Sequence, residues 1–261
     1  MLDLTGKRAL VCGSTQGIGR ACAEALARIG ADVTLVARDE AALARVRDGL
    51  SRDAGQRHAC LAADFRRPAE LRARVAAHVD QSGPIVILVN NTGGPPAGPI
   101  AEATPDAFLD AFQMHVVCNQ LLVQTLVPGM KSSGYGRIVN IISTSVRQPI
   151  PGLGVSNTTR AAVASWAKTL AGELGPFGIT VNNVLPGYTE TARLRSLIAA
   201  RAQREGQTPE QIEARMRGDI PLGRFGSSGE IAAAVAFLAS PAASYISGVS
   251  LPVDGGRISA V

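Results

Sequence analysis

The first residues whose spacing suggests chemistry are three glycines, Gly13, Gly17 and Gly19. They follow a short apolar run and open a segment with helical periodicity. Glycines in this arrangement allow a tight turn, and they let backbone N–H groups at a helix N-terminus approach a pyrophosphate. A purely structural turn is the alternative. The predicted dinucleotide loop consists of Gly13, Ser14, Thr15, Gln16, Gly17, Ile18 and Gly19.

Arg38 follows the next apolar run, which ends at Ala37. An acidic residue at this strand end binds the ribose 2′-hydroxyl of NAD, whereas an arginine accommodates the 2′-phosphate of NADP. The guanidinium fork matches a phosphate group, so the sequence favours NADP(H). Asp39 keeps NAD(H) as an alternative, and Arg38 could also be a solvated residue at a helix start.

Short apolar runs alternate with longer helical patterns along the whole chain. Strands are predicted at residues 8–12, 32–36, 58–62, 85–89, 137–142, 179–184 and 250–253. Helices are predicted at residues 17–29, from about 40, and at 68–79, 104–126, 156–174, 193–217 and 227–240. This alternation is typical of an α/β fold. We expect a single domain over residues 1–261 with a Rossmann-type, doubly wound parallel sheet of seven strands, and ligands beyond the carboxyl ends of its strands.

Composition excludes several classes of function. The 261 residues carry a formal net charge of +5, but the basic residues are scattered, so nucleic acid is not an expected partner. No apolar run approaches the roughly 20 residues that span a membrane. The four cysteines lack metal-ligand spacing, so we expect no metal and four small buried side chains in a reducing compartment. The start of the chain lacks a signal-peptide pattern, which makes the cytoplasm the expected location.

Several further motifs, in the right order, resemble the short-chain dehydrogenase/reductase family over nearly the whole chain, with similarity to 3-oxoacyl-(acyl-carrier-protein) reductases. Beyond the glycine loop, the matching residues are Asp64, Asn90, Asn91, Gly93, Pro186, Gly187 and the segment 253–256. Thr92 stands where the family has Ala. The resemblance implies further cofactor contacts at Arg38, Asp64, Phe65, Asn90, Asn91, Gly93, Arg160, Pro186, Gly187, Thr189 and Thr191.

The family's catalytic set of Asn, Ser, Tyr and Lys corresponds here to His115, Ser143, Ser156 and Arg160. Ser156 is a far weaker acid than Tyr. Arg160 lies one helical turn away and stays charged, so it can stabilise an oxyanion but relays protons poorly. His115, with a reference pKa of about 6.5, is the best candidate for proton transfer, and a structural histidine is its alternative. Tyr188 is a second candidate or an aromatic residue that lines a lid.

The resemblance also implies a substrate lid near residues 188–225. This segment is rich in arginine, which favours an anionic small-molecule substrate, although solvated helices explain the charges equally well. The first hypothesis is an NADP(H)-dependent oxidoreductase that acts on a carbonyl or alcohol, such as a 3-oxoacyl compound. The alternatives are an inactive nucleotide-binding regulator or partner subunit, and a lyase or dehalogenase on the same scaffold. We expect a homodimer or homotetramer, paired through helices 104–126 and 156–174.

Overall fold

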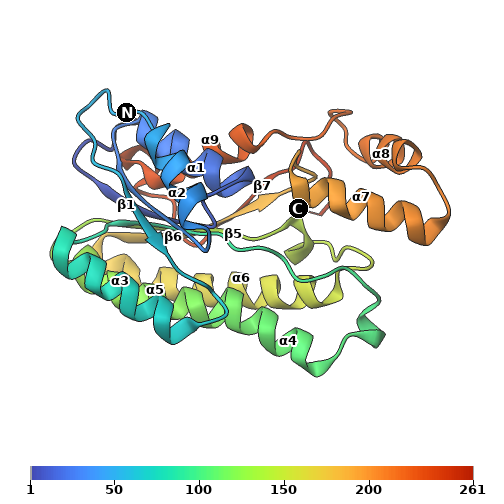
Figure 1. Cartoon of the computed structure of the whole chain (residues 1–261), viewed down its shortest axis with the longest axis horizontal. Helices are drawn as coiled ribbons and strands as arrows, with labels where there is room; N and C mark the ends of the chain where they lie inside the picture. The colour runs from blue at the N-terminus through green and yellow to red at the C-terminus, as the bar shows by residue number, and fades with distance from the viewer. Residues whose placement is uncertain (1, 261) are drawn as a thin grey trace.

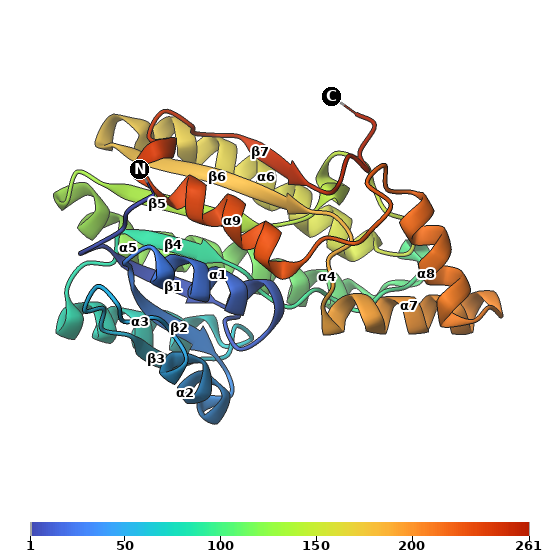
Figure 2. The same cartoon turned by 90° about the horizontal axis from the view of Figure 1, so that it is seen from above.

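A computed structural model of the chain describes residues 2–260. Its centre is one sheet of seven strands, and every strand pair is parallel. The strands are β1 (Arg8–Cys12), β2 (Asp32–Ala37), β3 (Ala59–Ala62), β4 (Ile87–Asn90), β5 (Gly136–Ile141), β6 (Ile179–Pro186) and β7 (Ser250–Val253). Their order is β3-β2-β1-β4-β5-β6-β7 (Figure 2), which confirms the predicted doubly wound fold.

Helices cover both faces of the sheet (Figure 1). One layer contains α1 (Gly17–Arg28), α2 (Glu40–Asp48) and α9 (Ser228–Ala239). The opposite layer contains α3 (Pro68–Ser82), α5 (Cys118–Ser132) and α6 (Gly154–Leu174). Each layer buries an apolar cluster against the sheet, because strands covered on both faces carry apolar side chains on both. The cysteines take part in this packing: Cys12, Cys22 and Cys118 are buried, and Cys60 is half-buried.

The helix predicted at 104–126 is longer and less regular than expected. It consists of α4 (Pro105–Phe112), a π-helical turn at Gln113–Val117, and α5, which continues past Pro128 to Ser132. The helix therefore continues beyond its predicted end at residue 126, through Pro128. Leu126 and Met130 on either side of it are buried, and their packing against the core offsets the hydrogen bond that a proline removes.

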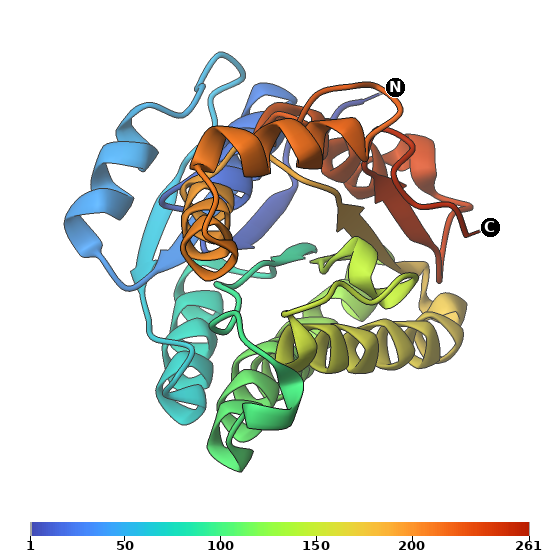
Figure 3. The same ribbon diagram turned by 90° about the vertical axis from the view of Figure 1, so that its right-hand side faces the viewer.

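The segment predicted as helical at 193–217 forms two helices, α7 (Ala192–Glu205) and α8 (Pro209–Gly218). Gly206 separates them with a left-handed φ of 63°. They lie beyond the carboxyl ends of the strands (Figures 1 and 3) and pack on each other through a small apolar core of their own. Within residues 2–260, no helix has both the length and the apolar character needed to cross a membrane.

Candidate active site

The centre of the site is the point where the direction of strand order changes, between β1 and β4. In a doubly wound sheet this switch point opens a crevice at the carboxyl ends of the two strands. Asn91, directly after β4, donates from Nδ2 to the carbonyl oxygens of Cys12 and Gly13, at 3.2 and 3.3 Å. This side chain thereby fixes the glycine loop to the neighbouring strand.

The glycine loop is packed so closely that side chains cannot replace two of its glycines. A Cβ on Gly19 would lie 2.1 Å from the carbonyl oxygen of Gly13, and one on Gly13 would lie 2.7 Å from Asn91. Helix α1 begins at Gly17 without a side-chain cap and without an acidic residue in its first turn. Its first N–H groups and its positive dipole end therefore suit an anion such as a pyrophosphate. The residues present fit the phosphate groups of a dinucleotide.

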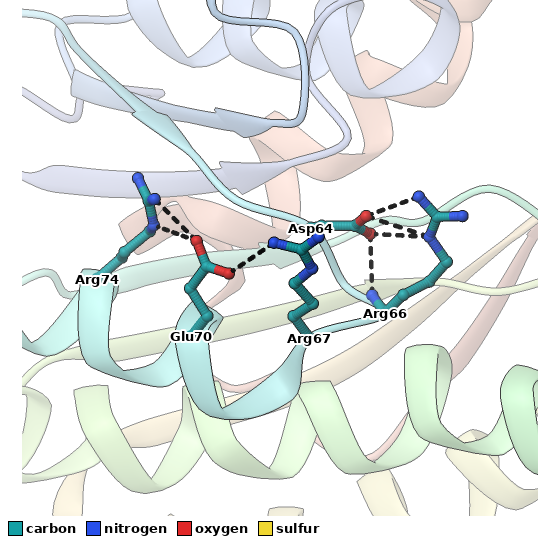
Figure 4. Close-up of polar contacts among 5 residues, drawn as sticks. All are labelled: Asp64, Arg66, Arg67, Glu70 and Arg74. Carbon is teal, nitrogen blue, oxygen red and sulfur yellow. Dashed lines mark hydrogen bonds and ion pairs between the residues drawn. The ribbon is translucent and has the colours of Figure 1, made fainter.

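Two arginines and one carboxylate lie at the ends of β2 and β3. Asp64 accepts hydrogen bonds from the side chain of Arg66, the shortest at 2.8 Å, and from its backbone N–H at 3.0 Å (Figure 4). These bonds, with help from nearby Arg38, lower the pKa of Asp64. Arg38 is exposed and has no ion pair among residues 2–260. Arg67 and Arg74 instead pair with Glu70 (Figure 4).

Asn90 belongs to a row of hydrogen-bonded side chains within the sheet. Its Nδ2 donates to Asn140 at 2.8 Å, Asn140 donates to Asn183 at 2.9 Å, and Asn183 donates to Ser250 at 3.1 Å. These residues are register partners on β4, β5, β6 and β7. The buried amide of Asn90 is thus oriented along the sheet, so any contact of this side chain with a cofactor stays a prediction.

Three of the four predicted catalytic residues come from β5 and α6. Ser143 follows β5, and its Oγ accepts a hydrogen bond from the backbone N–H of Ser145 at 3.0 Å. Ser156 and Arg160 are both half-buried and lie one turn apart on α6, which places them on one face. Nη1 of Arg160 donates to the carbonyl oxygen of Ile141 at 2.8 Å. This bond holds the guanidinium at the carboxyl end of β5, near Ser143.

The fourth residue, His115, lies inside the π-helical turn and is 4% exposed. Its Nδ1 is 2.6 Å from Oγ1 of Thr92. Burial, and then the charge of Arg160, lower the pKa of His115 from 6.5 to about 3, while the Gly93 backbone acts in the opposite direction. The imidazole is therefore neutral at neutral pH. Its Nε2 is buried and has no hydrogen-bond partner within residues 2–260.

Arg160 also has an altered pKa, which is lowered to about 10 by burial and by the charge of Arg193. A group with this pKa remains protonated near pH 7. Arg160 can therefore donate hydrogen bonds to a negatively charged oxygen, but it does not exchange its proton readily. The neutral imidazole of His115 can donate one hydrogen bond through its N–H, but with a pKa of about 3 it is a poor proton acceptor near pH 7, and it does not readily give up its N–H proton.

The turn after β6 joins the sheet to the lid. Gly187, which follows Pro186, lies very close to Asp254. A Cβ at position 187 would be 2.7 Å from the Cα of Asp254. Thr189 is buried, and Thr191 caps α7 by accepting from the N–H of Leu194. Cγ2 of Thr191 is 3.4 Å from the point where a Cβ on Gly17 would lie. The base of the lid therefore borders the glycine loop.

The tyrosines lie away from this centre or have other partners. Tyr188 accepts a hydrogen bond from Arg257 at 3.1 Å and packs edge-on against Phe225, an environment typical of an aromatic lid residue. Tyr135 is half-buried and donates to the carbonyl of Ala239 at 2.7 Å. It packs against the apolar cluster on the α9 side of the sheet. Tyr245 is fully exposed.

A family model described as enoyl-(acyl carrier protein) reductase matches residues 13–257 of this chain. The chain belongs to the short-chain dehydrogenase/reductase family. It is 34% identical to the 3-oxoacyl-(acyl-carrier-protein) reductase of Vibrio cholerae, over 98% of both chains. It is 35% identical to the cyclohexanol dehydrogenase of Rhodococcus sp., over 98% of this chain and 97% of that one. These matches confirm the predicted family and its similarity to 3-oxoacyl-(acyl-carrier-protein) reductases.

A solved structure extends the match to three dimensions. L-sorbose reductase from Gluconobacter frateurii, complexed with NADPH and L-sorbose, is 32% identical and superposes with a TM-score of 0.93 over all of this chain and 99% of its own. The prediction of an NADP(H)-dependent oxidoreductase of the carbonyl/alcohol class is confirmed at the level of the family. The roles of individual site residues stay predictions.

Two features of the site were missing from the sequence analysis. Thr92 was recorded there only as a departure from the family's Ala, yet it is the hydrogen-bond partner of His115. Arg193 was one of several arginines in the lid, yet its guanidinium lies near that of Arg160. The first pairing joins residues 23 positions apart, and no local spacing pattern indicates it.

Proposed function

We propose that this protein is an NADPH-dependent reductase of a carbonyl compound that uses Ser143, Arg160 and His115 in place of the family's Ser, Lys and Asn, and in which Ser156 does not replace the tyrosine as an acid. The observation that carries this proposal is the intact glycine loop, with its uncapped helix α1, beside an Arg160 anchored at the end of β5. NADPH bound there supplies the hydride. The remaining work is done by the side chains at the strand ends.

Ser143 and Arg160 hold and polarise the substrate oxygen. Both are donors at the same strand end, and an oxygen that gains negative charge during reduction is stabilised by fixed donors in a water-poor site. Arg160 contributes a permanent positive charge because its pKa of about 10 stays well above neutrality. The serine hydroxyl adds a neutral donor whose position is fixed by its bond with the Ser145 N–H.

His115 donates a hydrogen bond as a neutral imidazole, and the proton that the substrate oxygen gains comes from solvent through a water that the imidazole N–H orients. A neutral ring carries one N–H, and the tautomer is set by the partner of the other nitrogen. When the Thr92 hydroxyl donates to Nδ1, the proton resides on Nε2, the ring nitrogen without a protein partner in the described chain. Thr92 is thereby a positioning residue for His115.

The lid and the assembly complete the proposal. Residues 188–225 cover the substrate, with Thr189 and Thr191 against the cofactor side. Four exposed or partly exposed apolar residues on and beside α4, namely Ile100, Leu109, Phe112 and Val117, leave a surface suited to a second copy of this chain, and we propose a homodimer or homotetramer through it. Sedimentation equilibrium that finds only monomers would contradict this. A cytoplasmic location stays a prediction.

NADPH consumption tests the proposal. The purified protein is mixed with NADPH and a panel of ketones, aldehydes and 3-oxo esters, and absorbance at 340 nm is followed. The proposal expects consumption with at least one carbonyl compound, about 100-fold slower in Arg160→Ala. A protein that binds NADPH tightly but consumes none across the panel would instead be a nucleotide-binding regulator. Product formed without any added nucleotide would identify a lyase or dehalogenase.

A further inference from the structure

Two guanidinium groups lie close together beside Gly94, in the loop after β4. The point where a Cβ on Gly94 would lie is 3.5 Å from Nη2 of Arg193 and 3.8 Å from Nη2 of Arg160. Apart from Gly94 and its two chain neighbours, Nη2 of Arg193 is the heavy atom nearest to this point. Both guanidinium groups therefore lie beside the same side of Gly94, close enough together for one small anion next to them to contact both.

Neither cation is neutralised within the described chain. Each donates to a backbone carbonyl instead, Arg160 to Ile141 at 2.8 Å and Arg193 to Pro95 at 2.6 Å. No carboxylate of residues 2–260 forms an ion pair with either side chain. Proximity to Arg193 contributes to the lowered pKa of Arg160, as expected for like charges that lack a partner.

Most of the other arginines of the lid form ion pairs. Glu205 pairs with Arg201 at 2.6 Å and also with Arg215, while Glu213 pairs with Arg217 at 2.6 Å. These pairs make most of the lid a balanced, solvated surface, so the general cationic lid suggested by the sequence is too broad. Arg193 and Arg195 form no ion pair within residues 2–260, and of these two it is Arg193 that lies near Arg160.

The position of Arg193 in its helix adds a second observation. It lies in the first turn of the 14-residue helix α7, which contains no acidic residue in that turn. Cations are unfavourable at the positive end of a helix dipole, and anions are favourable there. The hydrogen bond from Arg193 to Pro95 joins the lid to the loop after β4 and holds the guanidinium toward Arg160. An anion between the two arginines would satisfy both charges and the helix terminus.

We infer that Arg193 and Arg160 together bind a carboxylate of the substrate, which makes the substrate an oxo acid whose carboxylate lies within a few bonds of the reacting carbonyl. The short distance follows from Arg160, which contributes to both the anion site and the carbonyl site. The inference rests on the proposed function for the reaction, but the anion site is a binding property that can be measured without turnover. Reduction adds hydride from NADPH to the carbonyl carbon and a proton to its oxygen, leaving the carboxylate unchanged.

Matched acids and esters test this inference. The rate constants kcat/KM are measured for 4-methyl-2-oxopentanoate and 3-oxobutanoate and for the methyl ester of each. We expect a preference of at least about tenfold for the acid of one pair, because hydrogen bonds to charged groups contribute this much or more. Arg193→Ala should lower kcat/KM for the acid about 10- to 100-fold and leave the ester unchanged, and Arg193→Lys should retain part of the preference.

Arg195→Ala is the matched control. Arg195 is exposed on the same turn of α7 and has no ion pair within residues 2–260, so its removal should leave the acid-to-ester ratio at the wild-type value. Equal ratios in wild type and Arg193→Ala would overturn the inference while leaving the reductase proposal intact. A raised Kd for NADPH in Arg193→Ala, with an unchanged ratio, would also overturn it, because the arginine would then serve the cofactor.

A binding measurement, which needs no turnover, tests the anion site separately from the proposed reductase activity. Binding of 2-hydroxy-4-methylpentanoate to the protein saturated with NADP⁺ is measured by calorimetry. Affinity that falls about tenfold in Arg193→Ala, and not in Arg195→Ala, supports the anion site even if no carbonyl compound is reduced. Equal affinity of this acid and its methyl ester for the wild type would overturn it. Melting curves of Arg193→Lys and Arg193→Ala show whether a loss reflects unfolding instead.

Discussion

Thr92 Oγ1 and His115 Nδ1 are 2.6 Å apart, and this hydrogen bond joins two of the positions at which the sequence predicts a departure from the family's pattern. The resemblance implies that Thr92, just after β4, stands where the family has alanine, and that His115, in the π-helical turn, stands where it has asparagine. The two changes are in contact, so they form one altered unit. The histidine gains a fixed orientation from the threonine, and the threonine hydroxyl gains a partner from the histidine.

The energetic coupling of this pair is the first prediction. Thr92→Val removes the hydroxyl at nearly constant volume and leaves a buried imidazole nitrogen unpaired, which should cost about 1–3 kcal/mol of unfolding free energy. His115→Asn and the double variant Thr92→Val/His115→Asn complete the double-mutant cycle. Urea unfolding of both single variants and the double variant should give a coupling energy of at least about 0.5 kcal/mol.

Thr125→Val is a suitable control for that cycle. Thr125 is half-buried on α5 and donates to the carbonyl of Leu121 in its own helix, so its loss leaves no buried group of another element unpaired. It should change stability less than Thr92→Val does. Strict additivity of the Thr92 and His115 substitutions would show that the hydrogen bond contributes nothing.

The stability of the fold should depend on pH through His115. Its pKa is about 3 in the folded state, because of burial and then Arg160, against 6.5 in the unfolded chain. Between these values the unfolded chain binds more protons, so stability decreases as pH falls below 6.5. From pH 6.5 to 5 this residue should cost about 2 kcal/mol. In urea titrations, His115→Asn should therefore lose less unfolding free energy than the wild type between pH 6.5 and 5. Identical pH profiles of the two proteins would contradict the lowered pKa of His115.

Arg160 should act on turnover more than on nucleotide binding. Arg160→Ala removes a fixed donor to the developing oxyanion and should lower kcat about 100-fold. Arg160→Lys keeps the positive charge, but its single ammonium group cannot replace a guanidinium that donates to the Ile141 carbonyl and to a ligand at the same time. The kcat of this variant should lie between those of the wild type and Arg160→Ala. Fluorescence titration with NADPH measures the Kd of each variant. A large loss of NADPH affinity with unchanged kcat would place Arg160 in cofactor binding instead.

Arg38 should select NADPH over NADH. The exposed guanidinium at the end of β2 has no ion pair in the described chain, which leaves it available to a 2′-phosphate. Arg38→Ala should weaken NADPH binding about 10- to 100-fold and leave NADH unchanged. Arg67→Ala is the control, because Arg67 pairs with Glu70. A similar loss for both nucleotides would contradict the role in selection.

The sequence predicted the sheet well because the patterns that mark its strands, apolar runs and turns, are local. Each strand is a short apolar run, and every run lies between helices that cover both faces, so periodicity and turns indicate the alternation. The helix around His115 was predicted less well. Its π-helical turn and its continuation past Pro128 depend on buried contacts with α3 and α6, which local propensity does not contain.

The site was predictable only in part, for a related reason. Gly13, Arg38 and Arg160 lie at strand ends or fixed spacings, and the structure brings these motifs to one edge of the sheet. The contact of Thr92 with His115 and the convergence of Arg160 and Arg193 depend on tertiary distances. The pKa of His115 differs from the value assumed from sequence because burial, which only the fold determines, is its main cause.

The transfer of deuterium from labelled NADPH to product tests the central claim most directly. The protein is incubated with NADPH carrying deuterium at C4 of the nicotinamide and with the panel of carbonyl compounds, including the oxo acids. We predict one deuterium on the carbinol carbon of an alcohol product, one NADPH consumed for each alcohol formed, and label transfer that is about 100-fold slower in Arg160→Ala. Tight binding of NADPH with no label transferred to any compound would contradict the account.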